Sequence, residues 1–113
     1  METFDTAEPD AFARVCLLGT AEGGRRTPIA NRYKCSVFFD EQRDVAHDCM
    51  LVLSSGESIA PGGEAKLVGI RFLDSVMVRP KLHPGLQLVM WEGKTIGSME
   101  ILETRGDRET EAR

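Results

Sequence analysis

The residues that first suggest chemistry form the stretch EGGRRTP at positions 22–28, where two glycines precede Arg25 and Arg26. Glycine-rich loops beside cations bind phosphate, because backbone N–H groups and a basic side chain surround the anion. A nucleotide-binding loop has the form GxxxxGK[ST] and opens a helix. This stretch has no glycine–lysine pair, and Pro28 leads into an extended pattern. We expect no nucleotide site here; the simpler alternative is a turn with solvated arginines.

Other catalytic signatures are also missing from the sequence. There is no GxSxG, HExxH or DxD-type cluster, although each serves a common hydrolytic or metal-dependent reaction. The two histidines, His47 and His83, lie in different segments without an evident nucleophile beside either. We expect a protein without catalytic residues, and an enzyme is the third choice among the functional hypotheses.

The three cysteines, Cys16, Cys35 and Cys49, do not form the close pairs that zinc sites favour. Each lies in an apolar or alternating stretch, where a free thiol behaves as a small hydrophobic group. His47 and Cys49 share a strand face, but the sequence offers no further ligands beside them. We expect buried free thiols, no metal and no cofactor.

The composition is that of an ordinary globular protein, with 42% hydrophobic and 28% charged residues among 113. This length is that of one domain with a hydrophobic core. No apolar run approaches the roughly 18 residues of a membrane helix. The first ten residues carry four acids and no base, unlike a secretory signal. We expect a cytoplasmic protein without membrane contact.

The net charge of −4 is unevenly distributed. Residues 1–10 carry −4 and residues 103–113 carry −1, so residues 11–102 carry +1. These boundaries predict an acidic N-terminal tail, a central domain and a charged C-terminal tail. The centre contains one basic cluster, Arg25, Arg26, Arg32 and Lys34. Nucleic-acid-binding domains usually have a larger basic excess, so the charge favours a solvated loop.

Apolar residues occur in short, mostly alternating runs, a pattern typical of strands. Residues 12–18, for example, place Ala13, Val15 and Leu17 on one face. The pattern predicts strands at 12–18, 32–39, 47–53, 64–73, 86–91 and 95–102. Six strands without a helix predict an all-β domain, either a closed antiparallel barrel or a small sandwich. We favour the barrel, because closure removes exposed strand edges.

Turn signals separate these runs. They are the charged DEQRD at 40–44, the glycines after Pro61, and a tight hairpin at Glu92-Gly93-Lys94. Residues 74–85 hold two prolines, and we expect a long connection there with a short edge strand at 76–79. Gly97 inside the last strand predicts a bend or bulge, as barrel corners require.

Several of these features together resemble the third, C-terminal β-barrel domain of translation elongation factor Tu. In order, they are the EGGRRTP loop, Tyr33 in the next strand, the Pro61-Gly62 turn and the ending GLQLVMWEGKTIG at 85–97. That family has a GGRxTP-like loop, an aromatic residue, a PG turn, a GLRF-type strand and an EGG-type hairpin followed by TVG. The resemblance covers residues 11–102, and the loop and hairpin are fairly specific together.

The resemblance implies a six-stranded antiparallel closed barrel, in agreement with the strand pattern. It also implies a domain that binds no GTP, packs against a GTPase domain and helps to receive a nucleotide-exchange factor. Its contacts with the T-stem backbone of aminoacyl-tRNA would fall on Arg25 and Arg26 of the loop and on Glu92 and Gly93 of the hairpin. Arginine forks and backbone amides suit phosphate contacts that position a nucleic acid without reading its sequence.

The sequence also departs from that family. We expect a free-standing domain without the GTPase domain and the second barrel. The EGKTIG hairpin is one residue shorter, the 74–85 connection is longer, and Trp91 stands where a basic residue is usual. If Leu88 and Met90 face the core, Trp91 faces outward and becomes a candidate anchor for a partner. Alternatively, the N-terminal segment or the 74–85 connection covers it.

Two functional hypotheses follow. The first is a non-catalytic, stand-alone binding module that engages a protein partner, with Trp91 in the interface and a possible link to translation. The second is an RNA-binding module that contacts a tRNA stem backbone through Arg25 and Arg26, with Arg32 and Lys34 as further basic contacts. The two differ in salt dependence, because contacts with several phosphates release counterions.

Overall fold

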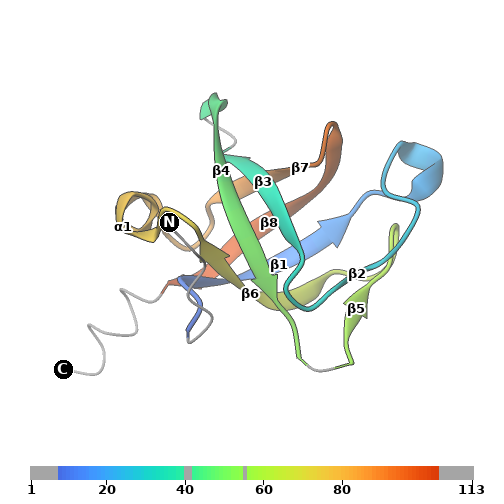
Figure 1. Cartoon of the computed structure of the whole chain (residues 1–113), viewed down its shortest axis with the longest axis horizontal. Helices are drawn as coiled ribbons and strands as arrows, with labels where there is room; N and C mark the ends of the chain where they lie inside the picture. The colour runs from blue at the N-terminus through green and yellow to red at the C-terminus, as the bar shows by residue number, and fades with distance from the viewer. Residues whose placement is uncertain (1–7, 40–41, 55, 105–113) are drawn as a thin grey trace.

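Six antiparallel strands close into a barrel in the computed structural model, which describes residues 8–39, 42–54 and 56–104 (Figure 1). The barrel strands are β1 (Ala11–Leu17), β3 (Lys34–Phe39), β4 (Gln42–Val52), β6 (Lys66–Phe72), β7 (Gln87–Trp91) and β8 (Thr95–Thr104). Around the barrel their order is β1-β6-β4-β3-β7-β8, and β8 pairs back with β1. The all-β, six-stranded closed barrel predicted from the sequence is therefore confirmed.

Alternation along each strand builds the barrel interior. On β1, Ala13, Val15 and Leu17 are at most 2% exposed, whereas Arg14 and Cys16 between them are exposed. Residues from the other strands meet them inside, among them Val37, Leu51, Ile70, Phe72, Leu88, Met90, Ile96 and Ile101. Burial of this apolar surface is the main favourable term in folding. The prediction of a buried Cys16 is wrong, because this residue occupies an outward position of β1.

Two short strands form a second, two-stranded sheet that the alternation did not predict. β2 (Ile29–Ala30) pairs with β5 (Ser58–Ile59), and both isoleucines at this pairing are fully or almost fully buried. A turn of 3-10 helix (Thr20–Glu22) precedes β2. Strands of two residues give no detectable period, so the sequence pattern could not reveal them.

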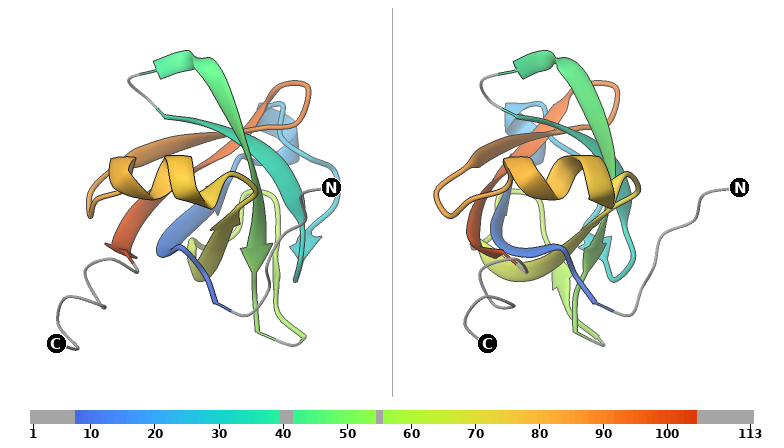
Figure 2. Two further views of the ribbon diagram at one scale, coloured as in Figure 1. Left: turned by 60° about the vertical axis from the view of Figure 1, so that its left-hand side comes forward. Right: turned by 90° about the vertical axis from the view of Figure 1, so that its left-hand side faces the viewer.

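The connection between β6 and β7 is helical rather than extended. It contains α1 (Ser75–Val78) and a 3-10 turn (Arg79–Lys81), and α1 crosses in front of the barrel strands (Figure 2). Val78 and Leu82 are buried in the core at a spacing of four residues, which suits a helical turn. The expected edge strand at 76–79 is therefore wrong.

A buried carboxylate joins this connection to the start of the chain that the structure describes. The Asp10 side chain is 0% exposed. Its Oδ2 accepts the Phe72 backbone N–H at 2.8 Å, and its Oδ1 accepts Arg79 Nε at 2.8 Å and Arg71 Nη1 at 3.3 Å. Asp10 thus ties β1 to β6 and to the segment after α1, although charge alone had grouped it with the acidic tail.

Several strand boundaries differ from those expected. β4 already begins at Gln42, so residues 42–44 of the expected turn belong to a strand. β8 continues to Thr104, past the expected end at 102. A register shift between Met90 and Trp91 lies opposite Gly97, as the bulge prediction required. The outer parts of both expected tails, residues 1–7 and 105–113, lie outside the described residues.

Candidate functional site

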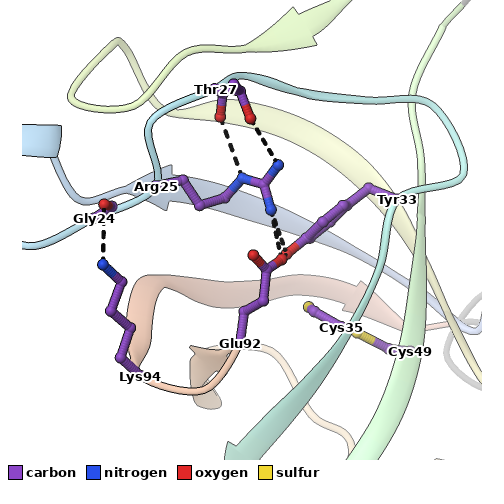
Figure 3. Close-up of polar contacts among 8 residues, drawn as sticks. All are labelled: Gly24, Arg25, Thr27, Tyr33, Cys35, Cys49, Glu92 and Lys94. Carbon is purple, nitrogen blue, oxygen red and sulfur yellow. Dashed lines mark hydrogen bonds and ion pairs between the residues drawn. The ribbon is translucent and has the colours of Figure 1, made fainter.

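The loop at 22–28 and the hairpin between β7 and β8 lie side by side (Figure 3). Arg25 Nη1 donates to Glu92 Oε2 and forms an ion pair with it. The same nitrogen lies 3.2 Å from the Tyr33 hydroxyl, and this hydroxyl donates to the same Glu92 oxygen. Arg25, Tyr33 and the sequence-distant Glu92 therefore form one polar cluster, which we call the Arg25 cluster.

Two glycines allow the loop to reach this position. Gly23 has a φ of 92°, a conformation that glycine adopts without strain. Gly24 is buried, and a Cβ on it would lie 2.2 Å from the Leu18 carbonyl oxygen. No side chain fits there unless the backbone moves. The glycines that first suggested phosphate binding thus have a sufficient role in the turn itself.

Arg25 is held by contacts within the protein. Its Nε donates to the Thr27 carbonyl at 3.2 Å, and its Nη2 donates to the Thr27 hydroxyl at 3.1 Å. The guanidinium lies over the Tyr33 ring, 4.8 Å from its centre, in a cation–π arrangement. The Arg25 side chain is 17% exposed, and that of Glu92 is 45% exposed. Arg25 therefore acts as a link between loop and hairpin.

Tyr33 is the proton donor at the centre of the cluster. Burial, and then the hydrogen bond to Glu92, raise the pKa of Tyr33 well above its ordinary value. Both effects favour the neutral phenol, because its ionisation would place a second negative charge beside the carboxylate. Tyr33 therefore remains a hydrogen-bond donor to Glu92 throughout the neutral range.

A shallow depression of about 280 Å³ adjoins the Arg25 cluster, and its lining residues include Arg26 and Lys94. Lys94 Nζ lies 3.5 Å from the Gly24 carbonyl oxygen. The structure thus brings three of the residues that the resemblance assigns to RNA, Arg25, Arg26 and Glu92, to one place. Arg32 lies apart from this depression, in the turn before β3.

A second depression, of about 370 Å³, adjoins the same hairpin; we call it the Trp91 groove. Its lining residues are Lys34, Cys35, Ser36, Asp48, Cys49, Trp91, Glu92 and Gly93. Trp91 is 39% exposed, and its ring packs edge-to-face on Phe38 with ring centres 5.7 Å apart. The outward orientation predicted for Trp91 is therefore confirmed.

The polar wall of the Trp91 groove comes from the paired strands β3 and β4. Ser36 Oγ donates to Asp48 Oδ1 at 3.0 Å across the pair. On the neighbouring position of each strand, the Sγ atoms of Cys35 and Cys49 lie 3.9 Å apart. The predicted turn at 40–44 is centred on residue 42. In a hairpin, residues at equal distances from the centre of the turn lie opposite each other, and positions 35 and 49 are each seven residues from it. The turn signal in the sequence therefore already implies the Cys35–Cys49 pairing, which was not among the predicted site residues.

His47 lies against an aromatic ring of the barrel. It packs on the Phe39 ring, with 5.0 Å between ring centres, and burial and nearby Lys81 lower its pKa.

Among the described residues, no three histidine, cysteine, aspartate or glutamate side chains are grouped as metal ligands would be. In the same part of the chain, no helix is long and apolar enough to cross a membrane.

No protein-family model matches the chain, and no curated protein matches it. What the structure defines is a class of architecture, a closed six-stranded antiparallel barrel. The barrel carries the Arg25 cluster and the Trp91 groove at its last hairpin, and Glu92 belongs to both.

Proposed function

We propose that this chain is a non-catalytic barrel module, similar to the third domain of elongation factor Tu, that binds a protein partner through the Trp91 groove. The observation that carries the proposal is the 39%-exposed Trp91 on the wall of a 370 Å³ depression. A large aromatic side chain beside a depression is a frequent energetic centre of protein interfaces.

The groove is lined by both apolar and polar groups. Trp91, whose ring packs on Phe38, supplies apolar surface, while Lys34, Asp48 and Glu92 supply charge of both signs. An apolar core with a polar rim is typical of protein interfaces. The proposed partner is therefore a protein surface or segment that places an apolar side chain against Trp91 and polar groups beside it.

The charges around the hairpin favour protein over RNA. The Arg25 charge is paired with Glu92, and Asp48 adds a further carboxylate on the groove side. A phosphate backbone laid along the hairpin would meet these carboxylates, and like charges in close contact are unfavourable. RNA binding through Arg25 would first require its separation from Glu92, Tyr33 and Thr27.

Comparative capture from native extract tests the protein proposal. We expect the wild-type protein to retain a defined partner, identified by quantitative mass spectrometry, that Trp91→Ala no longer retains. Leu67→Ala is the matched control, because Leu67 is also a large exposed apolar residue but lies on β6, away from the groove. Equal retention by the wild type and Trp91→Ala contradicts the proposal, provided that both proteins are folded by circular dichroism.

Titration with tRNA at two salt concentrations tests the competing RNA hypothesis. Contacts with several phosphates would give an affinity that falls steeply with salt and is lost in the Arg25→Ala/Arg26→Ala double variant. We expect no such binding at low salt. Salt-sensitive binding that depends on these arginines would replace the protein proposal with the RNA one.

A further inference from the structure

Cys35 and Cys49 occupy directly opposed positions of two barrel strands. β3 and β4 pair antiparallel with Cys35 opposite Cys49, and the two Sγ atoms lie 3.9 Å apart (Figure 3). Directly opposed residues in such a pair have Cα atoms about 4.5 to 5.5 Å apart, within the range that a disulfide spans. Both side chains also point to the same face. Rotation of the side chains, without a shift of the strands, can close the remaining distance.

The two thiols differ in their access to solvent. Cys35 is half-buried, whereas Cys49 is 0% exposed, and both contribute to the lining of the Trp91 groove. The hydrogen bond with Cys35 and burial raise the pKa of Cys49, and its sulfur is closed to solvent. Because the attacking sulfur must reach the small molecule, this difference in access sets an order of reaction. Cys35 reacts first with a molecule in the groove, and Cys49 reacts second.

We propose that Cys35 and Cys49 form a redox-active dithiol site that takes low-molecular-weight disulfides as its oxidant and closes to a cross-strand disulfide in the wall of the groove. The inference goes beyond protein binding and does not depend on it. The third cysteine, Cys16, is excluded from the site, because it lies on β1, which pairs with β6 and β8.

The chemistry proceeds in two thiol–disulfide exchanges. Cys35 gives its proton to solvent, and its sulfur attacks one sulfur of the small disulfide. The other sulfur leaves as a small thiolate and takes up a proton. Cys49 then attacks the Cys35 sulfur, and its proton passes to the departing small thiolate, which leaves as the second small thiol. Two electrons pass from the protein dithiol to the small disulfide, which becomes two thiols.

The test uses the folded Cys16→Ser protein, in which two of the three thiols remain and no other cysteine can interfere. The protein is incubated with hydroxyethyl disulfide, alkylated at intervals and weighed by intact mass spectrometry. We expect a transient adduct of one small thiol, followed by a monomer that has lost two hydrogen atoms and binds no alkylating reagent. Dithiothreitol should restore both thiols, and circular dichroism should show a folded barrel throughout.

A second variant tests the order of reaction. In Cys16→Ser/Cys49→Ser, we expect the Cys35 adduct to persist, because no second thiol is present to displace it. The main result does not depend on the folding of this variant, since Cys16→Ser keeps both thiols of the site. Two outcomes with the Cys16→Ser protein would overturn the inference. One is that both thiols survive incubation in the folded state. The other is that the Cys35 adduct persists, or that a disulfide forms between two protein molecules.

Discussion

Arg25 and Glu92 form an ion pair between the first loop and the last hairpin of the barrel, and the Tyr33 hydroxyl donates to the same carboxylate oxygen. These are two of the positions that the resemblance assigns to an RNA backbone. In this barrel they are partners of each other. The cluster therefore holds the hairpin beside the loop, and it fixes one side of the hairpin that carries Trp91 at its start.

The Arg25–Glu92 link should be measurable as a coupling free energy. A double-mutant cycle of Arg25→Ala and Glu92→Ala, read by chemical denaturation, should give a favourable coupling of about 0.2 to 1 kcal/mol. The coupling is small because Glu92 is 45% exposed and solvent screens the pair. Arg26→Ala combined with Glu92→Ala serves as the control and should be additive. Additivity for Arg25 and Glu92 as well would show that the pair contributes nothing to stability.

Tyr33 should ionise only at unusually alkaline pH. Burial and the hydrogen bond to Glu92 raise its pKa, and Tyr33 is the only tyrosine in the chain. Its tyrosinate absorbance should therefore be absent at pH values where a free tyrosine, with a pKa of about 10, is already ionised. Glu92→Gln should lower the midpoint, although burial should still keep it raised.

The same shift has a defined sign for stability. A raised folded-state pKa means that the folded protein holds the phenolic proton more tightly than the unfolded chain. The contribution of Tyr33 is therefore complete below the ordinary tyrosine pKa and is lost as the pH rises above it. Free energies of unfolding measured across this alkaline range should fall more steeply for the wild type than for Tyr33→Phe. Parallel curves would contradict the assignment.

The loop glycines should differ in their tolerance of a side chain. Gly24→Ala places a Cβ against the Leu18 carbonyl, whereas the Cβ of Gly23→Ala meets open space at a positive φ. We expect Gly23→Ala to destabilise the protein by about 1 kcal/mol and Gly24→Ala by about 2 kcal/mol or more. Thermal denaturation of both variants measures the difference. Equal losses would mean that the loop moves aside at Gly24 without cost.

The buried Asp10 should contribute more to stability than an exposed acid in a comparable pair. Asp10→Ala removes the carboxylate that forms an ion pair with Arg71, whose side chain is 8% exposed. Breaking a buried ion pair in this way costs about 3 kcal/mol or more. Glu100→Ala breaks the exposed pair with Arg14 and should cost less than about 1 kcal/mol. Urea denaturation compares the two, and a similar cost for both would contradict the anchoring role of Asp10.

The strand pattern predicted most of the barrel, because alternation directly reports which side chains face the interior. It placed Ala13, Val15 and Leu17 correctly on the inner face of β1. It failed for the helical connection after β6, where the buried Val78 of α1 follows exposed apolar residues and the buried Leu82 comes after the 3-10 turn. Four residues are too few for a helical period to appear against the alternating background.

The candidate site was less predictable, because it depends on contacts between distant segments. The resemblance singled out Arg25 and Glu92, but their contact with each other requires the closed barrel, which brings the loop and the last hairpin together. The Cys35–Cys49 pairing followed from the centre of the predicted turn and could have been found. The role of Asp10 could not, because the preceding acids placed it in a polar tail, and only the register of β1 against β6 buries it.

The affinity of Trp91→Ala for the captured partner tests the central claim most directly. With the purified partner, isothermal titration calorimetry should give a Kd that is at least about thirtyfold weaker for Trp91→Ala. This corresponds to the loss of about 2 kcal/mol of binding free energy that is typical when a central interface residue is truncated. Leu67→Ala should bind as the wild type does. An unchanged Kd for a folded Trp91→Ala protein would contradict the claim that this barrel binds its partner through the Trp91 groove.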